Sequence, residues 1–322
     1  DPMRMEFPDP AAPGAPMDNV PPGSGGEDFG GSICQTPDGR LFIQAGKTAF
    51  WNIEVVGMDG VHALPGGEME IREGDVRTAE RFRADFLQDA AGVKRVKVAR
   101  AKVAFTGEID KDFAGAEIVA YGKGEAASAR SAAAWDDERL YLAWDVRDGS
   151  PWVNAAKAPE QMYVGGDTVD FQLGLDGKAD AERAEAVAGD MRLSIGNFGG
   201  RATAVLYRPV CEVKKPATFS SGVVKEYRVD FVEVLAGVTI EVKVQPGKGY
   251  VVEAAVPLAE LGLKPAGGLA LRGDFGVTYG GPDGQRTRLR SHWSNQHTGI
   301  VDDAVFELKL EPRNWGELRF EP

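Results

Sequence analysis

The chain has 322 residues, a formal net charge of −12 and a pI of about 4.9. An acidic surface repels phosphate backbones, which argues against a nucleic-acid partner, and no apolar run is long enough to span a bilayer. A hydrophobic share of 43% and a charged share of 27% are typical of a globular protein, and 41 glycines and 19 prolines indicate many turns. Because the first residue is Asp1, we expect a piece of a longer protein.

The N-terminal part of the chain predicts an arm followed by a few short elements. Residues 1–31 are rich in Pro and Gly without an apolar period, which is typical of an extended arm. Residues 39–58 predict two short strands around a Gly-Lys turn. Residues 75–92 space apolar side chains three to four apart, which predicts an amphipathic helix ending at Gly92. We therefore expect 32–94 to form a small segment of strands and one helix.

From about residue 95 to the end of the chain, alternating apolar and polar residues predict strands. Turn residues separate ten such runs, which favours one antiparallel β-sandwich of the jelly-roll or immunoglobulin-like kind over 95–322. Short helices are expected at 180–189 and 257–263. The expected strands are 95–105, 139–146, 167–176, 191–198, 203–208, 226–234, 249–256, 272–279, 286–293 and 304–311.

Two of these runs, 167–176 and 191–198, place polar side chains together on one sheet face. One side of each run is apolar, and the other carries Asp170, Gln172, Arg192 and Ser194. Two interpretations stay open. The face is either solvated, with a cross-strand pair between Asp170 and Arg192, or a concave surface that hydrogen-bonds a hydroxylated ligand.

The tryptophans divide into core and candidate ligand-binding residues. Alternation places Trp144 in the core, and Trp135 and Trp315 are expected to pack beside strands. Trp152 follows a turn and is either an exposed platform or a lid on the sandwich edge. Trp293 lies at a strand end in the segment "SHWSNQHTG", which also contains two of the three histidines.

Few motifs for catalysis are present. The sequence has no G-x-S-x-G, H-E-x-x-H, P-loop or CxxC motif, although a pair of carboxylates active on glycosides is left open. A zinc site built on His292 and His297 is disfavoured because their spacing does not aim both rings at one point. Cys34 and Cys211 are either two buried free thiols or one long-range disulfide.

Five segments in order resemble the family 9 carbohydrate-binding modules and their DOMON-like relatives. They are "SARSAAAWDDERLYLAWDVRD", "YVGGDTVDFQLGLD", "GYVVEAAVPLAELGL", "GDFGVTYGGPDGQRTRLRSHWSN" and "PRNWGELRF", and the match covers about residues 95–322. The preceding stretch, "GGSICQTPDGRLFIQAGKTAFWNIEVVGM", resembles the last blade of a β-propeller. The resemblance implies a β-sandwich that binds sugar ends between two tryptophans and carries calcium.

The resemblance also assigns roles to particular residues. Trp293 matches one family tryptophan, whereas Val164 stands at the place of the other, with Tyr163 beside it. We therefore expect Trp293 to stack on a sugar, with Tyr163 or Trp152 as a second wall. The resemblance and the polar face together give the hydrogen-bonding residues Asp170, Gln172, Arg192, Ser194 and Asn295.

Calcium and haem b are the two cofactors that the sequence leaves open. Loop carboxylates suit calcium, and the candidates are Asp148, Asp283, Asp302 and Asp303. Some DOMON-like sandwiches bind haem b, for which the available axial ligands are Met162, Met191, His292 and His297.

The leading hypothesis is a non-catalytic module of a larger secreted bacterial protein. It would be extracellular or periplasmic and would bind a polysaccharide or oligosaccharide. A haem b-binding redox domain and an interaction module without a ligand are the alternatives.

Overall fold

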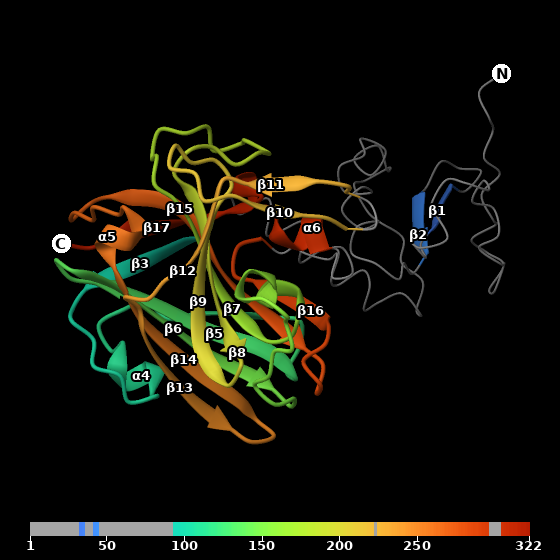
Figure 1. Cartoon of the computed structure of the whole chain (residues 1–322), viewed down its shortest axis with the longest axis horizontal. Helices are drawn as coiled ribbons and strands as arrows, with labels where there is room; N and C mark the ends of the chain where they lie inside the picture. Colours follow the sequence, from blue (N-terminus) through green and yellow to red (C-terminus); the bar gives the residue numbers. More distant parts are fainter. Residues whose placement is uncertain (1–31, 36–40, 45–92, 222–223, 296–303) are drawn as a thin grey trace. The chain divides into compact units, whose positions relative to one another are not determined.

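The computed structural model describes residues 32–35, 41–44, 93–221, 224–295 and 304–322 (Figure 1). The chain divides into two compact units, Asp1–Gly92 and Val93–Pro322. In the first unit, β1 (Ser32–Gln35) and β2 (Leu41–Gln44) pair antiparallel. The expected arm at 1–31, helix at 75–92 and second strand after residue 44 lie outside the described residues.

The second unit is a thirteen-stranded sheet that curls into two facing halves (Figure 1). The described pairs are antiparallel except β17–β3 and β3–β5, which are parallel and join the halves. The first half contains β12 (Phe231–Val234), β9 (Arg201–Arg208), β8 (Asp190–Phe198), β7 (Thr168–Gly174), β15 (Ala270–Gly280), β16 (Thr287–His292) and β17 (Gly316–Phe320). The second half contains β3 (Arg95–Arg100), β5 (Ala127–Trp135), β4 (Val119–Gly122), β6 (Arg139–Asp148), β14 (Gly249–Pro257) and β13 (Thr239–Gln245). The expected β-sandwich is confirmed.

The main core lies between the halves and follows the alternation of the strands. Val169, Phe171 and Leu173 of β7 are at most 2% exposed. Trp144 of β6 is fully buried, as predicted, with its ring edge-on to Phe275 at 6.2 Å between centroids. Alternate residues of each strand therefore supply a continuous apolar layer, and the opposite faces are left for other contacts.

Short helices and a small sheet cover the outer faces of the sandwich. In the second half, α4 (Ile109–Asp112) lies over β6, and α5 (Leu258–Leu261) follows β14 as predicted. In the first half, η4 (Pro159–Val164) and α6 (Ala304–Leu308) pack together over β8 and β9, near the small sheet of β10 (Ala217–Phe219) and β11 (Tyr227–Val229). The last helix, η5 (Pro312–Asn314), precedes β17. Among the described residues no helix is long and apolar enough to cross a membrane.

Two predicted elements are wrong. The run 304–311 was expected to be a strand, but Ala304–Leu308 is helical because Val305 and Leu308, three apart, share the apolar cluster with Met162 and Tyr163. The run 180–189 was expected to be a helix but consists of turns. Asp190 anchors it by accepting bonds from Arg183 and from the Val187 amide.

Candidate functional site

The polar face predicted on two strands extends over four neighbouring strands. β7 lies between β8 and β15, and β16 pairs with the other edge of β15. One row across them holds His292, Gly276, Asp170 and Ser194, and the next holds Arg290, Thr278, Thr168 and Gly196. We call this surface the polar face, and its side chains are Thr168, Asp170, Gln172, Arg192, Ser194, Asp274, Thr278, Arg290 and His292.

Asp170 and Arg192 form the predicted ion pair at the centre of this face. The carboxylate lies diagonally across from the guanidinium, since Asp170 is directly opposite Ser194 and Gln172 is opposite Arg192. Arg192 donates from Nε to Oδ1 at 2.9 Å and from a terminal nitrogen to Oδ2 at 2.8 Å. The pair is bidentate, which fixes the orientation of both groups.

The polar face is buried, so the interpretation of a solvated sheet is wrong. Arg192 donates to the Glu307 carbonyl of α6 at 2.6 Å, and the Tyr163 ring of η4 lies 5.5 Å from its guanidinium. Trp315 donates from Nε1 to Gln172 Oε1 at 2.8 Å. Segments from two distant parts of the chain therefore cover this face.

Burial and charge set the protonation of two groups on the face. Burial, and then the neighbouring Arg290, hold the pKa of His292 well below its usual value, so its ring is neutral. The ring lies over Gly276, where an added Cβ would be 2.6 Å from it, and Nε2 lies 3.3 Å from Gln172 Nε2. Burial raises the pKa of Asp274 to about 7, although three backbone amides, of Phe275, Ser294 and Asn295, donate to it.

Several polar atoms on this face have no hydrogen-bond partner among the described residues. They are Thr168 Oγ1, Ser194 Oγ, Thr278 Oγ1 and Arg290 Nε. Their residues are at most 5% exposed, and all four lie in adjacent rows of neighbouring strands. Buried polar groups are rarely left in this state, so the patch is suited to a ligand that both donates and accepts. Thr278 and Arg290 were not among the predicted site residues. The alternation of polar and apolar residues in 272–279 and 286–293 could have placed both side chains on the polar side of their strands.

The predicted aromatic residues lie in packed positions. Trp293 is 5% exposed, and its ring packs edge-on to Phe275 on the core side and lies over Gly316. Trp152, 7% exposed, packs on Tyr250 at 4.3 Å between centroids. Sugar stacking on Trp293 and a second wall at Trp152 stay predictions.

Tyr163 and Asn295 lie beside the polar face and are tied to the segments around it. The Tyr163 ring contacts Tyr207 and Phe219 edge-on, in addition to facing Arg192. Asn295 donates from Nδ2 to Glu311 at 2.8 Å. Both residues therefore help to hold the cover in place, and their contact with a ligand stays a prediction.

Of the four candidate metal ligands, the structure describes Asp148 and Asp283. Asp148 accepts from Ser150, and Asp283 accepts from the Gln285 amide, while Asp302 and Asp303 lie outside the described residues. Within the described ranges, no group of three or more His, Cys, Asp or Glu side chains is arranged to hold a metal ion. Calcium stays a prediction.

Among the candidate haem ligands that the structure describes, the two methionines lie on opposite sides of β8. Met191 belongs to the main core, and Met162 lies on the opposite side of β8, where its sulfur would be 3.2 Å from a Cβ added to Gly196. His292 faces the same side as Met162, and His297 lies outside the described residues. Haem b also stays a prediction.

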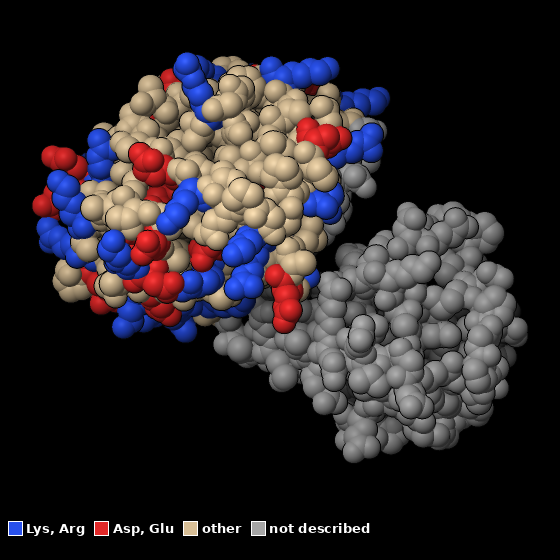
Figure 2. Space-filling view, turned by 90° about the horizontal axis from the view of Figure 1, so that it is seen from below, with Lys and Arg blue, Asp and Glu red and all other residues tan. Residues whose placement is uncertain are grey.

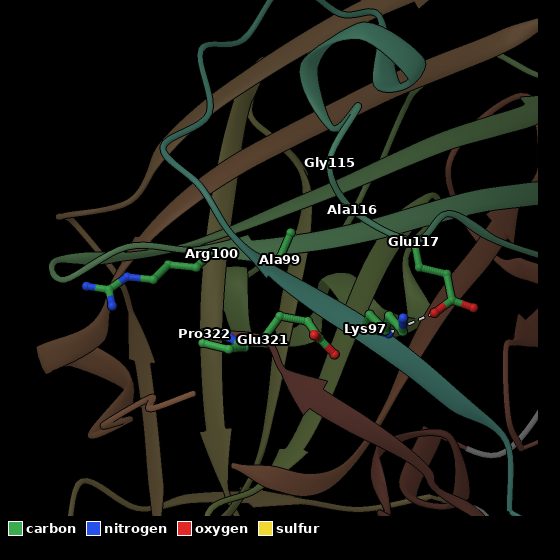
Figure 3. Close-up of a pocket in the computed structure, with 8 residues that line it drawn as sticks. All are labelled: Lys97, Ala99, Arg100, Gly115, Ala116, Glu117, Glu321 and Pro322. Atoms are coloured by element: carbon green, nitrogen blue, oxygen red, sulfur yellow. Dashed lines mark hydrogen bonds between the residues drawn. The ribbon is translucent and has the colours of Figure 1, made fainter. Parts of the chain in front are cut away.

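A surface hollow of about 670 Å³ lies elsewhere, between β3, the segment 115–117 and the C-terminus (Figure 3). Glu117 reaches toward Lys97 and accepts from its backbone amide at 3.0 Å, whereas Arg100 points away from them. Glu321 and Pro322 line the other side. This hollow shares no residue with the polar face.

Comparison with known proteins finds similar folds. No protein-family model and no curated protein matches the chain. A family 9 carbohydrate-binding module from Caldicellulosiruptor kristjanssonii, in complex with cellotriose, has a TM-score of 0.45 and 19% identity and covers 71% of this chain and 94% of its own. Its complex with glucose has the same TM-score and identity and covers 71% and 96%. A crystal structure from Bacteroides uniformis has a TM-score of 0.44 and 14% identity and covers 71% and 100%. At these identities the likeness concerns the fold alone.

Proposed function

We propose that this chain is a non-catalytic carbohydrate-binding module that holds a sugar against the polar face. The observation that carries the proposal is the patch of buried, unpartnered polar atoms on Thr168, Ser194, Thr278 and Arg290. Sugar hydroxyls donate and accept, as these threonine and serine hydroxyls do. The resemblance of the sequence to family 9 modules points to the same strands.

The bidentate ion pair between Asp170 and Arg192 supplies the rigid floor of this site. Each group fixes the other, so the remaining hydrogen-bonding directions on the face are set before a ligand arrives. A pre-formed site loses less conformational entropy on binding than a mobile one. The pair therefore positions the site, and the unpartnered atoms around it make the contacts.

The cover over the face determines how a sugar enters. α6 is held to the face by the bond from Arg192 to the Glu307 carbonyl and by the apolar contacts of Val305 and Leu308. A ligand that reaches Thr278 and Arg290 has to shift this short helix. We propose that binding displaces α6 from Arg192.

The full chain tested against a glycan array, with titration calorimetry of the sugars retained, checks the proposal. Thr278→Val removes one hydroxyl at nearly constant volume, and we expect it to weaken binding by about tenfold, the loss of roughly one hydrogen bond. Thr239→Val, on exposed β13, is the matched control and should leave binding unchanged. An array without a retained sugar would contradict the proposal and favour an interaction module.

We also propose that the module belongs to a larger secreted protein that is extracellular or periplasmic. The support is the resemblance of residues 30–58 to a β-propeller blade, which by itself is too short to form a propeller. Fractionation of the native host, with an antibody against this chain, tests the location. Detection only in the cytoplasm would contradict it.

A further inference from the structure

Arg290 is a buried arginine for which the described part of the chain supplies no hydrogen-bond or ion-pair partner. It lies on β16 opposite Thr278, which in turn lies opposite Thr168. The residue is 5% exposed and makes no hydrogen bond, and no ion pair within 4 Å, with any residue that the structure describes. Burying a charged guanidinium is unfavourable unless hydrogen bonds and an opposite charge compensate for it.

Of the acidic groups whose charges act on Arg290, Asp170 and Glu311 are hydrogen-bonded to other residues. Asp170 is taken by Arg192 through two hydrogen bonds. Glu307 and Glu311 act on Arg290 through their charges, and Glu311 accepts from Asn295 and Asn314. Burial, and then the charge of Arg192, lower the pKa of Arg290 to about 10, so it remains a cation at neutral pH.

We infer that the sugar bound on the polar face carries an anionic group, a carboxylate or a sulfate ester, and that Arg290 is its partner. The guanidinium offers paired N–H donors with the geometry that carboxylates and sulfates accept. The hydroxyls of Thr278 and Thr168 lie in the same row, have no hydrogen-bond partner among the residues described, and can donate to the same group. This inference rests on the proposed carbohydrate-binding function and names the class of sugar.

The charges around the site favour an acidic sugar over a neutral one. A neutral sugar would satisfy the three hydroxyls but would leave the guanidinium of Arg290 without a close ion-pair partner among the described residues. His292 beside it is neutral and adds no competing charge. A cationic ligand would face two guanidinium groups, of Arg192 and Arg290.

Matched sugars test the inference on the full chain by titration calorimetry. Glucuronate and glucose 6-sulfate are compared with glucose, and galacturonate with galactose. We expect the acidic member of at least one pair to bind at least tenfold more tightly, with an advantage that shrinks as salt is raised. If only the uronates bind more tightly, the site recognises a carboxylate. If only glucose 6-sulfate binds more tightly, the site recognises a sulfate ester.

The variant Arg290→Gln should abolish the preference. We expect at least thirtyfold weaker binding of the acidic sugar and less than a threefold change for the neutral one. Arg288→Gln is the control: it lies two residues away on the same strand, half-exposed, and should bind as the wild type does. Because Arg290 has no described partner, its removal should leave the melting temperature unchanged or higher, which separates a binding effect from misfolding.

The two proposals fail in different ways. If neutral and acidic sugars bind equally, and Arg290→Gln changes neither, the acidic-sugar inference is overturned while the binding function stands. If no sugar of either kind binds the wild-type chain, on the array or in solution, the binding function itself is overturned.

Discussion

The buried ion pair of Arg192 and Asp170 lies in the candidate site and also contributes to the stability of the fold. Both side chains are at most 1% exposed, so each depends on the other for its hydrogen bonds. The exposed pair between Arg95 and Glu317, with a 3.4 Å separation and side-chain exposures of 57% and 25%, lies in a different environment. Water solvates the exposed partners when their contact is lost, but cannot do so in the buried pair.

Arg192→Met should therefore lower the free energy of unfolding by about 3 to 5 kcal/mol, because Asp170 is left charged and buried. Arg95→Met should lower it by less than about 1 kcal/mol. The double variant Asp170→Leu with Arg192→Met should recover much of the loss. Urea unfolding followed by circular dichroism measures all three, and equal losses for the two single variants would contradict the account.

Glu253 of β14 makes stability depend on pH. It accepts from the Gly107 amide at 2.8 Å, and the nearby Asp112 of α4 acts on it through its negative charge. Burial raises the pKa of Glu253 from its usual 4.5 to about 7. The folded state therefore binds a proton that the unfolded chain releases, and its contribution is complete below about pH 4.5 and is lost as the pH rises through 7.

Glu253→Gln should remove this part of the pH dependence. The amide keeps an acceptor for Gly107 and, like the protonated carboxyl, carries no charge, so the variant should match the wild type near pH 4.5. At pH 8 it should be more stable by about 1 to 3 kcal/mol. Unfolding curves at both pH values measure the difference. A variant less stable than the wild type at pH 8 would show that Glu253 is favourably ionised there.

At the level of elements, α6 covers the polar face, yet the sequence predicted a strand in its place. Its residues alternate as a strand does, but Val305 and Leu308 pack in one apolar cluster with Met162 and Tyr163 of η4, and this contact favours the helix. A five-residue helix has little stability of its own. Tertiary contacts therefore hold α6 over the polar face, and the proposed displacement by a ligand requires these contacts to break.

Hydrogen exchange tests this movement. With a bound sugar, the Lys309 amide, which donates to the Val305 carbonyl at 3.0 Å, should exchange faster. The Leu263 amide, bonded to the Leu258 carbonyl around α5 at 3.1 Å, is the control and should not change. Slower exchange at Lys309 on binding would contradict displacement of α6.

The sequence predicted which side of each strand is apolar and which is polar, but not which segments cover the polar side. Alternation identified the apolar side of β7 and β8 and the polar side with Asp170 and Arg192, because a strand's period is fixed by local geometry. It did not reveal that Trp315 and α6 close this side, because such contacts depend on how distant segments fold back. Strand β5 was also not predicted, since its run of alanines has low β-propensity and forms a strand only between its neighbours.

At the scale of the molecule, the chain is acidic overall, whereas the polar face contains two arginines. The sequence carries a net charge of −12, and Figure 2 shows basic and acidic side chains interspersed on the surface that it presents. The polar face instead concentrates two buried arginines within the fold. Two buried arginines on a covered sheet face fit the proposed binding of a small anionic or polar molecule better than the binding of a long polyanion such as nucleic acid.

A crystal structure of the full chain with a sugar retained from the array tests the central claim most directly. We predict sugar oxygens within hydrogen-bonding distance of Thr278 Oγ1 and Ser194 Oγ, with an anionic group on Arg290 and α6 moved from Arg192. A sugar bound only at the surface hollow of Lys97 and Glu117, with the polar face unchanged, would contradict it.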